Sequence, residues 1–149
     1  MSYTADSDLL TIIAERTLAQ LSADDPQAQM PDWLVVAEAR AYADGQIDAR
    51  LRQRYPLPLA AVPRELKDWA LALAREWLYA RRPDGPDLPA AVRTAAKEAL
   101  AALDAVRDGK MSLAIPVGDA GAETPVPESG RVVVRGPLRT YNDDLWELY

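Results

Sequence analysis

The sequence contains no cysteine, no histidine and no phenylalanine. Without cysteine and histidine the chain cannot form disulfides, thiolate nucleophiles or Cys/His metal sites, and it lacks the side chain best suited to proton transfer near neutral pH. Most familiar active-site chemistries are therefore excluded. We expect a protein that is not an enzyme and that binds no cofactor and no metal.

Long hydrophobic runs are also missing. No apolar stretch approaches the roughly 20 residues of a membrane span, and the first residues lack a basic region followed by an apolar one. We therefore expect a soluble, cytosolic chain without membrane contact. The net charge of -6 argues against a protein whose main task is gripping nucleic acid, because that binding depends on basic side chains. An acidic surface suits either solubility or a surface that DNA passes without sticking.

What the chain does contain favours helices. Its 149 residues are 49% hydrophobic, and the apolar residues are mostly alanine and leucine, which suit closely packed helices. We predict an all-α fold: a small bundle of about four helices over residues 1–109, followed by an extended C-terminal arm over residues 110–149.

Prolines, capping residues and apolar spacing set the expected helix bounds. The predicted helices run from Thr4 or Asp6 to about Arg16, from Pro31 to about Arg54, onward from Pro63, and from Pro89 to Gly109. Residues 22–30, 54–59 and 81–88 are predicted loops. The helix after Pro63 has the cleanest amphipathic pattern, so we expect it at the centre of the core.

The helix expected from residue 31 to 54 carries two patterns. Trp33, Val36 and Ala37 begin its predicted apolar side, and Gly45 either weakens it or marks a close crossing. A charged stripe recurs at four-residue steps: Arg40, Asp44, Asp48 and Arg52. Such a stripe is usually a solvated face, and the alternative is a contact between subunits.

After Gly109 the chain becomes rich in proline and glycine, which rules out a continuing helix. Two β-prone runs, residues 113–117 and 131–135, could pair with each other, lie on the core or join strands of other subunits. Three arginines suit acidic surfaces of a partner, and five large side chains close the sequence and need a cover. These predicted interface residues are Arg131, Arg135, Arg139, Tyr141, Leu145, Trp146, Leu148 and Tyr149.

Two classes of function can be tested against the residues: a DNA-binding regulator and a hydrolase. A small helical DNA-binding regulator would use the helices on either side of residues 81–88 as a helix-turn-helix, but Arg93, Lys97 and Glu98 are poor equipment for reading bases. A carboxylate-dependent hydrolase would need Asp44 and Asp48 buried together in a cleft. The sequence contains no phosphate-binding loop, nucleophile elbow or dinucleotide fingerprint.

Several passages, in order, resemble a known family. They are Tyr3 with Asp8-Leu9-Leu10, residues 43–51 (ADGQIDARL), residues 54–59 (RYPLPL), residues 62–66 (VPREL), Trp77-Leu78-Tyr79 and Asp108-Gly109-Lys110. Together they resemble a Mu-like phage protein family of formerly unknown function, which is similar to the head-to-tail adaptor (connector) proteins of tailed phages. The resemblance covers about residues 3–113, so the arm after residue 113 lies outside it.

The resemblance implies a structural virion protein in the neck between head and tail. It implies a homo-oligomeric ring of about twelve copies below the portal protein, through which DNA passes without specific binding, and which receives the next neck or tail-completion protein. It implies no catalytic residues. Such a protein would be made in the cytoplasm of the host bacterium.

Overall fold

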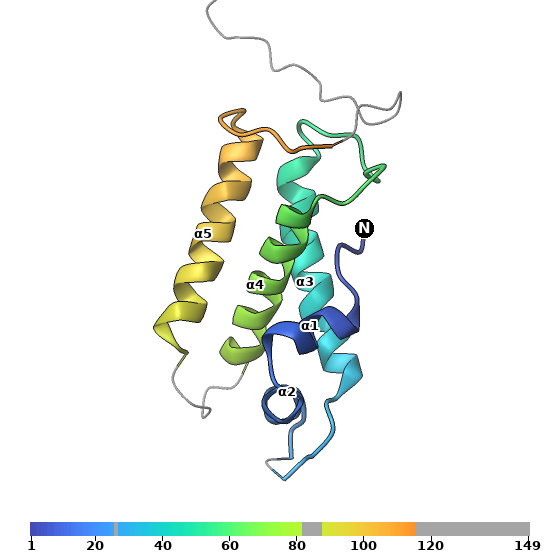
Figure 1. The fold of residues 1–149 in the computed structure, drawn as a ribbon, viewed down its shortest axis with the longest axis vertical. Coiled ribbons are helices and arrows are strands. Elements are labelled where there is room, and N and C mark those ends of the chain that lie inside the picture. The colour runs from blue at the N-terminus through green and yellow to red at the C-terminus, as the bar shows by residue number, and fades with distance from the viewer. Residues whose placement is uncertain (26, 82–87, 116–149) are drawn as a thin grey trace, which may run out of the picture.

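The computed structural model describes residues 1–25, 27–81 and 88–115. These residues form five helices, shown in Figure 1: α1 (Asp6–Ile12), α2 (Glu15–Ser22), α3 (Trp33–Leu51), α4 (Arg64–Ala80) and α5 (Ala90–Arg107). The described part of the chain contains no β-strand. The predicted all-α fold is therefore confirmed, with five helices where about four were expected.

Three long helices make the body of the bundle. Figure 1 shows α3, α4 and α5 side by side, each running opposite to the one before it, with α1 and α2 packed across α3 and α4. α4 contacts all four of the other helices. Its inner face is fully apolar, and the prediction that this helix forms the centre of the core is confirmed. The buried residues of that face are Leu66, Ala70, Leu71, Leu73, Ala74 and Leu78.

Two prolines mark the starts of helices, and one glycine marks the end of a helix, as expected. Pro63 and Pro89 are the N-cap residues of α4 and α5. At the other end of α5, Gly109 has a positive φ of 78°, which suits a residue without a Cβ. The Lys110 N–H donates to the Ala105 carbonyl at 2.8 Å and the Gly109 N–H donates to the Val106 carbonyl at 3.2 Å. This pair of bonds is the Schellman motif, which satisfies the last carbonyls of the helix.

The first predicted helix is wrong in its extent. The chain becomes extended at Ile13, with φ −130° and ψ 125°, so α1 ends at Ile12 and a separate α2 follows. The break lets Leu9 and Ile13 stay buried while the direction of the chain changes. α2 was not predicted, because the apolar pattern on either side of the break reads as one short periodic run.

The second predicted helix is two residues too long at the start and three too long at the end. The Asp32 carboxylate accepts the Leu34 N–H at 2.9 Å, so Asp32 is the N-cap and Pro31 precedes the helix. The buried face of α3 includes Val35 and Val36, whereas Trp33 is 41% exposed. Nothing lies within 4 Å of a Cβ placed on Gly45, so this glycine marks no close crossing.

Ser22 joins the ends of three helices. Its hydroxyl donates to the Leu18 carbonyl at 2.7 Å and accepts the Asp32 N–H at 2.9 Å. The Arg81 guanidinium, just after α4, donates to the Ser22 carbonyl at 3.0 Å and to Asp24 at 2.7 Å. These bonds fix the loop between α2 and α3 against the lower end of the bundle.

Candidate interaction surfaces

The corner after α3 holds the beginning of the C-terminal arm. Arg54 is 8% exposed, and its guanidinium donates to the carbonyls of Val106 at 3.0 Å and Met111 at 3.1 Å. The hydroxyl of buried Tyr55 accepts the Leu113 N–H at 3.0 Å. Hydrogen bonds from a buried charged group are among the stronger ones, about 1.5–3 kcal/mol each. The two corner residues thus fix the chain beyond α5.

The arm therefore starts from a defined place. Leu113 is buried and Ile115 packs against the core, at the end of the bundle where α3 and α5 finish and α4 begins (Figure 1). Residues 113–115 of the first β-prone run form no strand. The rest of that run, the second run and all eight predicted arm interface residues, from Arg131 to Tyr149, lie outside the described residues.

The N-terminal residues cover most of the predicted charged stripe on α3. The Met1 ammonium pairs with Asp48 at 2.7 Å, and the Tyr3 hydroxyl donates to the same carboxylate. The Tyr3 N–H donates to Asp44 at 3.2 Å. Since two of the stripe's carboxylates are engaged inside the chain, a hydrolytic role for Asp44 and Asp48 has no support from their geometry.

Arg40, the first residue of the stripe, is engaged in the same way. Its guanidinium pairs with Asp6, donates to the Thr4 carbonyl, and donates to the Ser2 hydroxyl at 2.7 Å. Arg52, the last residue of the stripe, is exposed in the turn after α3. The structure thus brings Arg40, Asp44 and Asp48 together under the N-terminal segment and leaves Arg52 apart from it. Their use as a ring contact stays a prediction.

The covered stripe is electrostatically distinctive. Burial, with the neighbouring Asp48, raises the pKa of Tyr3 above its ordinary value. The hydrogen bond to Asp48 raises the pKa of the Met1 ammonium, and burial raises the pKa of Asp44. Sequence reasoning missed this cover, although the tyrosine in an otherwise polar N-terminus was a signal that the segment packs.

The beginning of α3 carries an exposed apolar patch, formed by Met30, Trp33 and Leu34. Met30 is 73% exposed, Trp33 41% and Leu34 72%. Side chains three and four positions apart share one face of a helix, which puts Trp33 and exposed Ala37 together. This patch was not predicted, because Trp33 had been assigned to the core.

An apolar groove lies across α4, between α1 and α5. Its volume is about 200 Å³. Ile12 comes from α1, Val92 and Ala95 from α5, and the small Ala72 with Leu71 from α4. Two charged residues of α4, Asp68 and Arg75, also line the groove. The Nε of Arg75 is buried without a hydrogen-bond partner among the described residues, while its guanidinium lies 6.0 Å from the ring centre of Tyr79.

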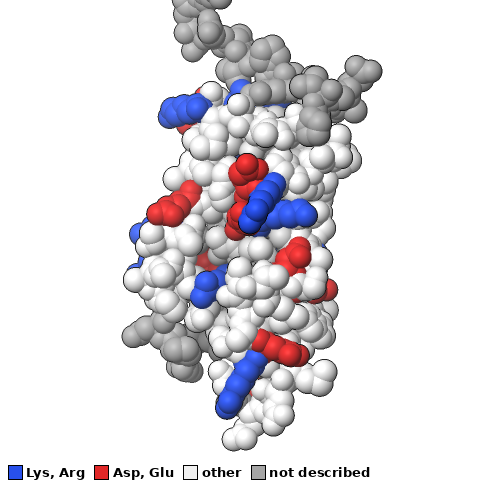
Figure 2. All heavy atoms as spheres, viewed as in Figure 1, with Lys and Arg blue, Asp and Glu red and all other residues white. Residues whose placement is uncertain are grey.

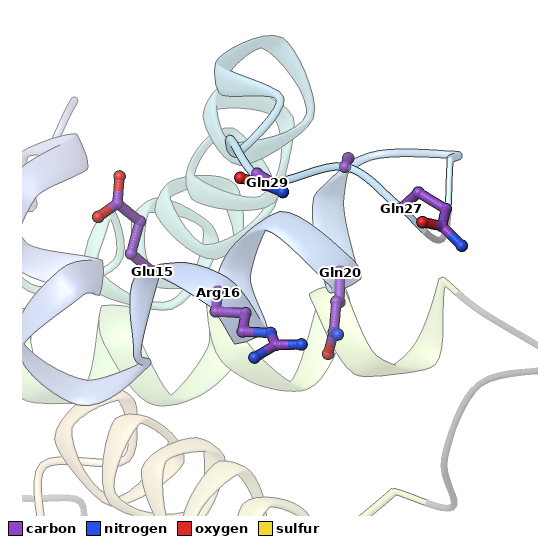
Figure 3. Close-up of a pocket in the computed structure, with 6 residues that line it drawn as sticks. Glu15, Arg16, Gln20, Gln27 and Gln29 are labelled. Carbon is purple, nitrogen blue, oxygen red and sulfur yellow. The ribbon is translucent and has the colours of Figure 1, made fainter.

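A larger hollow lies between α2 and the loop that follows it, with a volume of about 570 Å³. Figure 3 shows Glu15, Arg16 and Gln20 projecting from α2, and Gln27 and Gln29 from the loop, with the side chains pointing in different directions. All five are exposed. Splayed, solvated amides and one charge of each sign do not converge on a common ligand, so this hollow has no evident chemistry.

Neither alternative class of function gains support from the geometry. The helices α4 and α5 lie side by side and run antiparallel, unlike the steeply crossed helices of a helix-turn-helix (Figure 1). On the face seen in Figure 2, acidic and basic side chains are scattered over a largely uncharged surface, without a basic patch. Within the described ranges no three acidic residues gather to hold a metal ion, and no helix is long and apolar enough to cross a bilayer.

The sequence matches a protein-family model over most of its length. No curated protein matches the sequence. The family described as bacteriophage Mu, Gp36 matches residues 3–134, which includes all five helices and most of the arm. The match extends the earlier resemblance by about 20 residues, into the second β-prone run, and leaves the apolar end of the arm outside it. Since the match covers far more than half of the chain, the protein belongs to the bacteriophage Mu Gp36 family.

Proposed function

We propose that the protein is a structural virion protein, a head-to-tail adaptor in the neck of a phage particle. In this role copies of the chain form a homo-oligomeric ring of about twelve subunits below the portal protein. The ring extends the DNA channel and receives the next neck or tail-completion protein. DNA passes through the lumen without specific binding.

The observation that supports the proposal most is the extent of the family match. It runs from the N-terminal segment through the bundle and into the arm, so both parts belong to one phage-family unit. The arm is fixed to the bundle by Arg54 and Tyr55, which gives it a defined origin at one end of the body. From residue 116 to 149 it can extend by about 110 Å, at ~3.3 Å per residue, which is enough to reach a neighbouring protein.

The chemistry of the arm also suits an assembly step. Its last nine residues carry five large apolar or amphipathic side chains, and such ends are unfavourable in water unless they dock. A segment that orders on binding covers a wide surface at an entropic cost, which suits a contact formed once during assembly. The arm's arginines are suited to acidic surfaces of the portal or of a sister subunit.

The test compares two versions of the last nine residues in a phage that depends on this protein. One variant replaces the large side chains of the segment with serine: Tyr141, Leu145, Trp146, Leu148 and Tyr149. The matched control replaces its polar residues with serine: Asn142, Asp143, Asp144 and Glu147. Both variants keep the length of the arm, and circular dichroism should show unchanged helix content.

We expect the first variant to be lost from portal-bearing heads in sedimentation, and the control to remain attached. Normal attachment of the first variant would remove the arm from the proposal. Absence of the unaltered protein from purified particles, measured by mass spectrometry and by antibody labelling of the neck, would overturn the adaptor role itself.

A further inference from the structure

The exposed apolar patch at the start of α3 and the apolar groove across α4 are chemically matched. Besides Met30, the patch presents two large side chains at the start of α3: Trp33 is 41% exposed and Leu34 is 72% exposed. The groove is lined mainly by small or aliphatic groups and is open. Exposed apolar side chains of this size are typical of protein contact sites, where they fill pockets of a partner.

The two surfaces face different directions. Trp33 lies seven positions before Arg40, and Ala37 lies seven positions before Asp44. Seven positions are about two helical turns, so all four residues share one face of α3. That face is the one covered higher up by the N-terminal segment, which Figure 1 shows on the side of α3 away from α5. The groove, in contrast, is bordered by α5. One molecule cannot insert its own patch into its own groove, but a second copy beside it can.

Charge supports the same pairing. Glu38 is exposed one turn after Leu34, and exposed Asp32 precedes the patch, so the rim of the patch is acidic. In the groove, Asp68 and Arg75 put one charge of each sign seven positions apart on α4, and the buried Nε of Arg75 has no hydrogen-bond acceptor among the described residues. A carboxylate brought in beside Leu34 would give this guanidinium an acceptor, since charge-assisted pairs of this kind are the stronger hydrogen bonds.

We propose that Trp33 and Leu34 of one copy dock into the α1/α4/α5 groove of the next copy, with Glu38 facing Arg75. This is a head-to-tail contact, in which each copy offers its patch to one neighbour and its groove to the other. The inference rests on the proposed ring, because such contacts produce a ring when the rotation between neighbours closes. The charged stripe on α3 is then an internal contact and not the ring contact.

The natural absence of cysteine allows a clean test by disulfide cross-linking of the full-length chain. Leu34→Cys protein is mixed with Ala95→Cys protein and oxidised; both positions are exposed. The matched control pairs Ala95→Cys with Tyr42→Cys, since Tyr42 is exposed on α3 outside the patch. A disulfide needs Cβ atoms about 4 Å apart, so it reports direct contact.

We expect a cross-linked pair from Leu34→Cys with Ala95→Cys and only background from the Tyr42→Cys control. The double variant on one chain should give a ladder of multiples. Equal cross-linking of the control, or efficient pairing of Leu34→Cys with itself, would overturn the head-to-tail contact. So would preferential cross-linking of Ala95→Cys to Trp146→Cys, because the arm would then occupy the groove.

Charge reversal tests the same contact without cysteine. Glu38→Arg and Arg75→Glu should each weaken self-association at least about tenfold, measured by analytical ultracentrifugation, and the double variant should recover most of it. Absence of recovery in a double variant with native helix content would contradict the pairing of Glu38 with Arg75. These experiments use purified protein alone, so their failure is distinguishable from failure of the adaptor role in the particle.

Discussion

Tyr55 both packs in the core and holds the chain that follows α5. Its ring is buried in the corner after α3, and its hydroxyl is the acceptor of the Leu113 N–H at 3.0 Å. A buried N–H that loses its only acceptor costs more than the lost bond itself, because the group is also kept from water. Tyr55 therefore controls where the chain leaves the bundle, in addition to stabilising it.

The substitution Tyr55→Phe keeps the ring and removes the acceptor. We expect a loss of about 1–2 kcal/mol in the free energy of unfolding, measured in urea, and faster hydrogen exchange at the Leu113 amide. Tyr79→Phe is the control, because Tyr79 is only partly buried and its ring faces Arg75. Equal exchange at Leu113 in both variants would show that the hydroxyl does not hold the arm.

The N-terminal cover of α3 should make the protein less stable as the pH rises into the alkaline range. The pKa of the Met1 ammonium is raised from its ordinary value of 8.0, so its contribution is complete below pH 8 and is lost as pH rises through the raised pKa. The pKa of Tyr3 is raised from 10.0, so its contribution is lost only above pH 10, where the unfolded chain ionises first.

We therefore expect the free energy of unfolding to fall in two steps between pH 7 and pH 11, with the second step absent in Tyr3→Phe. Tyr42→Phe, at an exposed tyrosine, should keep both steps. Urea titrations at fixed ionic strength measure the profile. A second step that persists in Tyr3→Phe would assign it to a different group.

At the scale of the helix, the two glycines within the described residues, Gly45 and Gly109, have opposite roles. Gly45 lies in the interior of α3, exposed, with open space where a Cβ would be. Gly109 ends α5 with a φ of 78°, a conformation that costs other residues about 1–2 kcal/mol. Only the second glycine is required by the geometry of the chain.

Gly45→Ala should thus stabilise the protein by about 0.5–1 kcal/mol, because alanine loses less backbone entropy in a helix. Gly109→Ala should destabilise it by about 1 kcal/mol. The two variants serve as controls for each other, since the chemical change is identical. Urea unfolding measures both, and shifts of the same sign would contradict this account of α3 and α5.

The helices differ in how far sequence determines them. The bounds of α4 and α5 follow from Pro63, Pro89 and Gly109, which act locally. The break at Ile13 does not, because its cause is the burial of Leu9 and Ile13 against helices that come later in the chain. The spacing of apolar residues predicts one apolar side for α3, with Trp33 on it. In the structure α3 carries apolar residues on more than one face, and Trp33 lies on an exposed one.

At the scale of the whole molecule, the fold class and the central helix were predictable, and the surfaces were not. A stripe such as Arg40, Asp44 and Asp48 looks solvated in sequence, and only tertiary structure shows that residues 1–6 cover it. The Arg54 and Tyr55 contacts connect positions more than 50 residues apart, which no local pattern encodes. Residues 54–59 were among the passages on which the family resemblance rests.

The N-terminal cover also has a consequence for the order of events as the chain is synthesised. α3 packs against α4 and α4 packs against α5, and such contacts between helices adjacent in sequence favour rapid folding. Residues 1–6, in contrast, contact side chains of α3 that lie 34–47 positions later in the sequence. Their contacts can therefore form only after α3 has been made, although the segment itself comes before α3 in the chain.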